Sequence, residues 1–240
     1  MLSQAFNDIV EKRRSNRSFD LDIHIPDEVV KKSLERAILS PNSSNMQLWE
    51  FYRITSQELK SKLVPLCFNQ SAAKTADQFV VFVTRQDLWK QRASWNKETL
   101  LKVIPDDKEK YKKRTIQYYG KLMPMAYRND PFGFWTLVRK SVCFAIGLFR
   151  PIVQLGGKAD QRVVLHKSCA LAAQTFMLSI TAEGFDSCPM EGFDQRRVKK
   201  LLQLPPASEI NMIIGIGKGT EGGIHWPRFR VPYDEVVFEK

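Results

Sequence analysis

The sequence contains few of the residues that hold metal ions or disulfide frameworks. It has four cysteines, none of them in a Cys-x-x-Cys pair, and three histidines in 240 residues. Zinc sites and disulfide-stapled folds need closely spaced cysteine and histidine residues, so we expect no metal site. Scattered free cysteines are typical of a reducing compartment. A chain of this length can bury a core without such crosslinks.

Long hydrophobic runs are also scarce. The most apolar stretch, Phe134–Val153, is interrupted by Arg139, Lys140 and Arg150. A membrane-spanning helix needs about 20 mostly apolar residues. The first fifteen residues contain two acidic residues and lack the apolar centre of a signal peptide. We therefore expect a soluble cytoplasmic protein without a membrane span.

Acidic residues are outnumbered by basic ones. The chain has 37 Lys and Arg against 26 Asp and Glu, a net charge of +11. Much of the excess lies between Arg85 and Arg128, where the run Lys108–Arg114 is accompanied by aromatic residues. Such interleaving can bind single-stranded nucleic acid or another anionic surface, although a solvated helical face is the more usual explanation. No zinc-finger spacing or RNA-recognition signature is present, so we expect no nucleic-acid partner.

Apolar periodicity and turn residues predict a mixture of helices and strands. Helices are expected over Ser3–Arg14, Pro26–Ser40, Ser56–Cys67, Ser168–Glu183 and Asp194–Leu202. Strands are expected over Leu48–Thr55, Phe79–Thr84 and Ile210–Ile216, with an extended tail over Pro227–Lys240. These elements do not alternate as regular βαβ units, which favours the α+β class.

The segment at about 85–161 has a helical composition but a poor apolar pattern. Pro105, Pro124, Pro131 and the pair Gly156-Gly157 interrupt it. We interpret it as a basic helical insertion on a single domain that spans residues 1–240.

Two short arginine-rich segments are suited to an anionic ligand. Arg13, Arg14 and Arg17 lie within five residues that also contain Ser15. A planar guanidinium group donates two parallel hydrogen bonds to a phosphate, although an exposed basic helix end would have the same composition. In the extended tail, Arg228 and Arg230 would project to one side as a second clamp or as an edge-protecting tail.

Two further segments could contact a heterocyclic ligand. The run Ser40–Trp49 begins with amides and hydroxyls, which offer both donors and acceptors to a ring edge, but it could equally be a polar loop. The run Cys188–Asp194 precedes a helix, and Gly192 within it would let a ligand approach the backbone. A tight turn in which Asp194 caps the helix is the alternative.

Together and in this order, these segments resemble the flavin-dependent nitroreductase family. The family patterns R-R-S-x-R-x-F, S-P-x-x-x-N-x-Q-x-W, P-[IM]-E-G-F-D and basic-x-R-x-P correspond to Arg13–Phe19, Ser40–Trp49, Pro189–Asp194 and Arg228–Pro232. The match covers roughly the first 80 and the last 75 residues, within the usual boundary error, and leaves the middle segment poorly matched. The resemblance implies an α+β sandwich with a central, mainly antiparallel sheet between helices. It also implies an intertwined homodimer with FMN at the subunit interface.

The resemblance further implies a role for individual residues. The FMN phosphate would be held by Arg13, Ser15, Arg228 and Arg230. The ribityl chain and the N1/O2 edge of the ring would be approached by Arg14 and Arg17. The ring would be lined by Pro41, Asn42, Ser43 and Asn45 from the partner subunit, and Asn69 would contact the pyrimidine edge. The N5 and O4 positions would lie beside the block formed by Pro189, Met190, Glu191 and Gly192.

The implied activity is ping-pong oxidation of NADH or NADPH, with a nitroaromatic, a quinone or a related small molecule as electron acceptor. The flavin carries the hydride, so the resemblance implies no catalytic acid or base, and Arg17, Glu191 and Gly192 would tune or position the ring. Other chemistries of the same fold, such as dehalogenation, dehydrogenation or flavin breakdown, remain alternatives. Ala72 stands where many relatives have a basic residue, and Lys74 two positions later is a candidate substitute.

Overall fold

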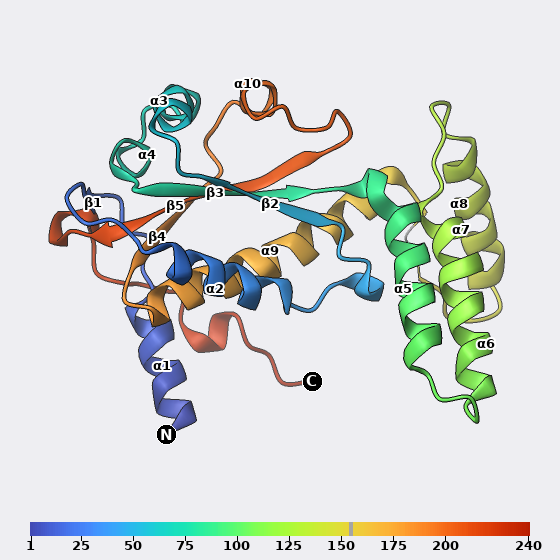
Figure 1. Cartoon of the computed structure of the whole chain (residues 1–240). Coiled ribbons are helices and arrows are strands. Elements are labelled where there is room, and N and C mark those ends of the chain that lie inside the picture. The colour runs from blue at the N-terminus through green and yellow to red at the C-terminus, as the bar shows by residue number, and fades with distance from the viewer. Residues whose placement is uncertain (154–155) are drawn as a thin grey trace.

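The protein is described by a computed structural model over residues 1–153 and 156–240, and its centre is a five-stranded sheet (Figure 1). The strands are β1 (Phe19–Asp20), β2 (Trp49–Ile54), β3 (Gln78–Thr84), β4 (Asp186–Met190) and β5 (Glu209–Gly219). The order is β1-β5-β3-β2, β4 also pairs with β5, and all these pairings are antiparallel. The predicted α+β class with a mainly antiparallel sheet is confirmed.

Helices cover both faces of this sheet, and α2 and α9 lie on the opposite face from α3, α4 and α10 (Figure 1). The α-helices are α1 (Leu2–Lys12), α2 (Asp27–Ile38), α3 (Gln57–Leu66), α4 (Ser71–Thr75), α5 (Trp89–Val103), α6 (Glu109–Gln117), α7 (Met123–Tyr127), α8 (Phe134–Gly147), α9 (Lys158–Ala182) and α10 (Gln195–Leu201). Short 3-10 turns occupy Ser43–Asn45, Gln86–Leu88, Glu221–Gly223 and Tyr233–Glu235, and a π-helical turn, η3, joins α6 to α7 over Tyr118–Leu122.

The sheet separates two hydrophobic cores. Every residue of β3 is buried. Because successive side chains of a strand point to opposite faces, Val81 packs with Leu63 on the α3 side, whereas Phe82 packs with Phe176 on the α9 side. The loops at the strand ends are thus held by a sheet that is packed on both faces.

Three predicted boundaries are wrong. The first helix begins at Leu2 with Met1 as its N-cap, not at Ser3. The long helix α9 begins at Lys158 rather than Ser168, because the Asp160 carboxylate accepts a hydrogen bond from Gly157 N at 2.8 Å and starts the helix there. The tail is not uniformly extended, since Tyr233–Glu235 forms a 3-10 turn.

Cys188, Pro189 and Met190 were expected only in a segment that precedes a helix, with a tight turn as the alternative, but they belong to β4, with Cys188 opposite Gly215. Within the described residues β4 pairs along its length with β5 and on its other side makes only an isolated bridge at Ser187, so Pro189 lies on an edge strand, where proline is tolerated. The Glu191–Gly192 turn is therefore held at the end of a strand. The two-residue strand β1 and the short helix α4 were not predicted.

The middle segment forms a helical arm at one end of the sheet (Figure 1). It consists of α5, α6, η3, α7 and α8, and its helical character is confirmed. A third hydrophobic cluster, which includes Leu48, Ala93, Tyr119 and Leu165, joins the arm to the sheet and α9. Residues 158–161 belong to the core helix α9 and not to the arm. The description of the arm as an insertion on a single domain stays a prediction.

The helix α9 is long and apolar enough to cross a membrane when only its length and composition are considered. It packs between α2 and the sheet, and ten of its residues, including Cys169, Phe176 and Ile180, are buried in the protein. Its apolar character is that of a core helix.

Candidate functional site

The segment that follows α1 is fixed against the sheet by Asn16. Ser15 forms an isolated parallel bridge with Ser187 of β4, and Asn16 N donates to Ser187 O at 3.2 Å. The Asn16 side chain is 3% exposed and donates to Thr220 O at 3.1 Å. A Cβ atom at Gly219 or Gly223 would overlap this amide, so both glycines make room for it. The anchoring of Asn16 sets Arg13, Arg14 and Arg17 beside the start of β4.

The two ends of the chain meet at the end of α1. The Arg228 guanidinium donates to the carbonyl oxygens of Val10 at 3.1 Å, Glu11 at 3.0 Å and Arg13 at 2.6 Å. The last carbonyls of a helix have no partner within the helix, and Arg228 supplies donors for them. Arg14 in turn donates to Trp226 O at 2.6 Å. These bonds join residues more than 200 positions apart.

The convergence produces a concentration of positive charge, which we call the cation cluster: Arg13, Arg14, Arg17, Arg228 and Arg230. These residues and Ser15 line a cavity of about 270 Å³. Burial lowers the pKa of Arg13, and the charges of Arg228, Arg230 and Arg14 lower it further. Within the described part of the chain no carboxylate forms an ion pair with the five arginines. Mutually repelling cations around a cavity favour the binding of an anion there.

The glycine turn lies beside a second loop. Gln70 Nε2 donates to Gly192 O at 2.6 Å and to Cys67 O at 3.0 Å. Phe68 and Asn69 have left-handed backbone conformations, with φ of 55° and 52°. A Cβ atom on Gly192 would lie 3.2 Å from Gln70 Nε2, so a side chain there would disturb this bond. Asn69 and Gly192, predicted to contact one ligand, are thus on adjacent loops.

Arg17 belongs to the cation cluster and lies near Cys188 of β4, the strand that leads into the glycine turn. Burial raises the pKa of the Cys188 thiol, and the positive charge of Arg17 partly opposes that effect. Arg17 and Glu191 are exposed, whereas the side chain of Met190 is buried in the core. Any contact of Met190 with a ligand would therefore involve its backbone.

The loop that was predicted to line the ring, Pro41–Asn45, does not lie beside the cation cluster. Ser40 Oγ donates to Thr175 Oγ1 at 2.8 Å, and Asn96 donates to Asn45 O at 2.7 Å. The Pro41–Asn45 loop is thereby held beside α5 and α9, at the opposite end of the molecule from α1 (Figure 1). A single chain does not bring this loop to the cation cluster.

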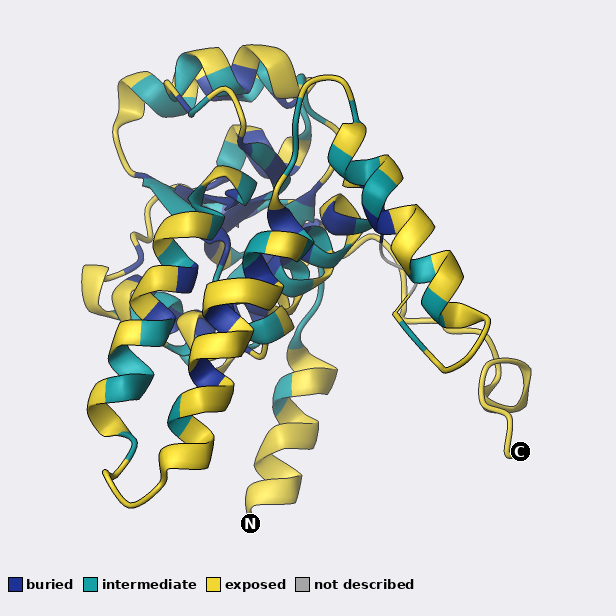
Figure 2. Ribbon diagram, turned by 90° about the vertical axis from the view of Figure 1, so that its right-hand side faces the viewer, coloured by how far each residue is buried: buried dark blue, intermediate teal, exposed yellow. Residues whose placement is uncertain are grey.

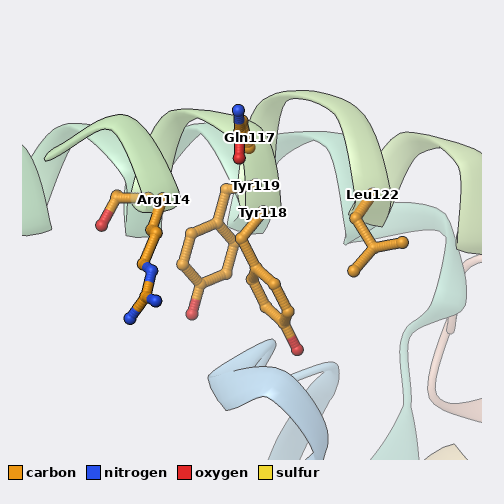
Figure 3. Close-up of a pocket in the computed structure, with 6 residues that line it drawn as sticks. Arg114, Gln117, Tyr118, Tyr119 and Leu122 are labelled. Atoms are coloured by element: carbon orange, nitrogen blue, oxygen red, sulfur yellow. The ribbon is translucent and has the colours of Figure 1, made fainter. Parts of the chain in front are cut away.

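A second cavity, of about 470 Å³, adjoins that loop (Figure 3). It is lined by Arg114, Thr115, Gln117, Tyr118, Tyr119 and Leu122. Tyr118 OH lies 2.7 Å from Ser44 Oγ, and Tyr119 OH donates to Ser44 O at 3.0 Å. The cavity includes the π-helical turn η3, and such turns occur frequently at functional sites. It presents aromatic rings and one guanidinium group.

Comparisons with known proteins agree with this arrangement. A model of the Nitroreductase family matches residues 10–218. The chain belongs to the nitroreductase family. It is similar to the protein DrgA of Synechocystis, with 29% identity over 89% of this chain and 84% of DrgA. It is also similar to YdgI of Bacillus subtilis, which is named among the NAD(P)H nitroreductases, with 26% identity over 97% of this chain and 96% of YdgI.

Solved structures of the nitroreductase family share the fold. The protein ydfN of Bacillus subtilis has a TM-score of 0.76 and 24% identity, with complete coverage of both chains. A protein of Exiguobacterium sibiricum in complex with FMN has a TM-score of 0.69 and 22% identity over 98% of this chain and 97% of that protein. The chain is thus an oxidoreductase of the nitroreductase family, for which FMN and NAD(P)H are typical.

The residues present fit FMN. The unpaired cation cluster offers charge-assisted hydrogen bonds to a phosphate. The Gly192 position has no side chain to obstruct a flat ring, and Asn69 on the neighbouring loop carries an amide that can donate and accept.

Some residues of the site were not predicted from the sequence. Asn16 lies inside the arginine motif, but its role depends on Thr220 and Ser187, which are distant in the sequence. Gln70 follows Asn69, and only the fold shows that it holds Gly192. The basic residue expected near position 72 is replaced by Ala72, which is buried in the core, whereas Lys74 is exposed on α4.

Proposed function

We propose that this protein is an FMN-dependent NAD(P)H oxidoreductase that works as a homodimer and reduces small acceptors such as nitroaromatics or quinones. The observation that carries the proposal is the cation cluster, in which arginines from both ends of the chain line one cavity with no carboxylate paired to them in the described structure. FMN, when bound, supplies the hydride chemistry that amino-acid side chains lack.

The residues of the chain bind and orient the cofactor. Arg13, Ser15 and Arg230 hold the phosphate, while Arg228 braces the end of α1 and adds its charge to the same cavity. Arg17, next to β4, places a positive charge beside the ring edge on which negative charge develops during reduction. Gly192 and Glu191 would present backbone groups to the N5 and O4 positions of the ring.

A homodimer completes the site in this proposal. The Pro41–Asn45 loop is remote from the cation cluster of its own chain, and the same loop of the partner subunit would line the ring. Apolar residues that would be buried between two subunits are exposed on α1 and on the tail (Figure 2): Leu2, Phe6, Val10, Phe229, Val231, Tyr233 and Phe238. None of residues 2–12 is buried in the single chain.

The cavity beside η3 is the candidate acceptor site. Tyr118 and Tyr119, which line the cavity, are hydrogen-bonded to Ser44 of the Pro41–Asn45 loop. The cavity would therefore adjoin a flavin that this loop covers. Exposed Tyr118 and Leu122 offer an apolar surface to a flat aromatic acceptor.

The nucleic-acid alternative receives less support. Three of the basic residues on the Lys108–Arg114 face lie within 4 Å of acidic neighbours: Lys108 with Asp107, Lys112 with Asp106, and Lys113 with Glu109. These pairs reduce the net charge that the face can offer to a polyanion.

Anaerobic stopped-flow spectroscopy tests the proposal. NADH or NADPH should bleach the flavin absorbance of the FMN-loaded protein, and a nitroaromatic or quinone mixed in afterwards should restore it. If neither nicotinamide bleaches the flavin, the proposed function is wrong. Bleaching that only an enone or a halogenated acceptor reverses would point to the alternative chemistries of the fold.

A further inference from the structure

The burial pattern of helix α8 is the reverse of that of an ordinary surface helix, because a charged residue is buried and the large apolar residues are exposed. Its one buried residue is Arg139, which is 6% exposed. By contrast, the exposed fractions are 60% for Phe134, 66% for Leu137, 69% for Phe144 and 66% for Leu148. The helix lies at the far right of the molecule in Figure 1 and is largely exposed in Figure 2.

Polar contacts hold α8 in place. Arg139 donates to Gly156 O at 3.0 Å and to Asn129 Oδ1 at 2.8 Å, and also to the carbonyl oxygen of Arg128. At the start of the helix, the Asp130 carboxylate accepts a hydrogen bond from Trp135 N at 2.8 Å. The apolar residues are not needed for these contacts, so they are available to bind something outside the chain.

The exposed apolar residues form a stripe along one face. Phe134 and Leu137 are three residues apart, Leu137 and Phe144 seven, and Phe144 and the C-cap residue Leu148 four, and these spacings place side chains on one face of a helix. Phe149, 89% exposed, extends the stripe beyond the helix end. An exposed apolar surface of this kind marks a site of contact with another protein or a membrane.

The charges around the stripe favour a membrane. Residues 131–159 contain no aspartate or glutamate, and two exposed cations accompany the stripe, Lys140 on α8 and Arg150 just after it. Apolar residues bordered by cations bind the interface of a bilayer with anionic lipids. A second copy docked through the same face would bring these cations towards their own counterparts.

We propose that α8 and Phe149 dock this protein on the surface of an anionic phospholipid bilayer, with the apolar stripe inserted between the headgroups and Lys140 and Arg150 against lipid phosphates. The helix lies in the interface and does not span the membrane, because α8 has only 14 residues. The docking is a binding property beyond the oxidoreductase activity and does not depend on it.

Vesicle flotation of the full-length protein tests this assignment. The protein should float with vesicles of phosphatidylcholine mixed with phosphatidylglycerol and remain at the bottom with phosphatidylcholine alone. Leu137→Glu with Phe144→Glu should reduce the partition coefficient by about a hundredfold or more, since each buried side chain of this size contributes about tenfold. Lys140→Gln should reduce it about fivefold.

Matched substitutions on another helix of the arm, α6, serve as controls. Ile116→Glu on α6 changes an exposed apolar residue and Lys110→Gln removes an exposed cation, and neither should alter flotation. Phe149→Glu, outside the helix, gives an independent test if the double variant does not fold, as judged by circular dichroism. The proposal is overturned if the wild-type protein binds no vesicles, or if Lys110→Gln lowers binding as much as the α8 variants do. A loss of oligomer mass in the double variant, with no vesicle binding by the wild type, would instead make the stripe an interface between copies.

Discussion

Arg13 and Arg228 contribute to the cation cluster in different ways. The guanidinium group of Arg228 is bonded to three carbonyl oxygens at the end of α1, whereas that of Arg13 is surrounded by like charges. Removal of Arg228 therefore affects the fold as well as the ligand, and removal of Arg13 affects the ligand alone.

Arg13→Ala should weaken FMN binding by about ten- to hundredfold, because a hydrogen bond to a charged group contributes about 1.5–3 kcal/mol. The melting temperature of the FMN-free protein should not fall, since the variant relieves repulsion with Arg228 and Arg230. Arg228→Ala should lower both the FMN affinity and the melting temperature of the FMN-free protein. Fluorescence titration with FMN and thermal unfolding of the FMN-free protein measure the two effects. The exposed Arg162→Ala is the matched control, and unchanged FMN affinity in Arg13→Ala would exclude Arg13 from the phosphate site.

The cysteines differ in their expected reactivity. Burial raises the pKa of Cys67 to about 11 and that of Cys169 to about 12, and burial also raises the pKa of Cys188. These groups are thiols at pH 8, and only the thiolate is alkylated rapidly. Mass spectrometry after brief treatment with iodoacetamide should find Cys143, which is half-buried, modified first. Modification of Cys188 at the same rate would contradict its role as a core residue.

At this scale the sequence predicted the residues that line the cavity better than the residues that support it. Arg13, Ser15 and Arg228 could be chosen because their chemistry suits a phosphate. Asn16 and Gln70 could not, because an amide that holds a distant backbone group is indistinguishable from a surface amide until the fold places its partner.

Among the elements, α8 depends on an acidic cap. The Asp130 carboxylate accepts hydrogen bonds from the N–H groups of Trp135, Phe134 and Phe132, and these bonds lower its pKa. A lowered pKa means that the stabilisation is complete above the ordinary value and is lost as the pH falls through the folded-state value. The cap is therefore fully present at neutral pH.

Asp130→Ala should loosen the start of α8 at neutral pH without unfolding the sheet. Amide hydrogen exchange should become faster over residues 131–139 and stay unchanged in β3. Asp107→Ala, at an exposed carboxylate before α6, is the control. Equal protection of residues 131–139 in the variant and the wild type would show that Arg139 alone holds α8.

Element boundaries were predicted where local signals agree with the fold, as at α10, where the Asp194 side chain caps the helix at Arg197 N. They were not predicted where tertiary pairing decides. Pro189 disfavours a strand by local rules, yet pairing with β5 makes it part of β4. Likewise the first ten residues of α9 lack a clear apolar stripe, because their polar side chains bond to distant segments, as Gln161 does to Asn129 and Arg162 to Glu209.

For the whole molecule, the proposed function requires that two chains build each site. Phe6 is 58% exposed on α1, in a stripe with Leu2 and Val10. Phe6→Asp should therefore give a monomer, and FMN affinity should fall with it because the partner loop is lost. Light scattering and FMN titration measure these effects, with Leu21→Asp, at an exposed residue outside α1, as control. A Phe6→Asp dimer would place the interface elsewhere.

The most direct measurement is the FMN content of the purified protein after size-exclusion chromatography with light scattering and absorbance detection. The account predicts a dimer peak with one FMN per chain, and a dimer peak for Arg13→Ala depleted of FMN at the same protein concentration. A colourless protein that takes up no added FMN, or a monomer that binds a full complement of it, would contradict the account.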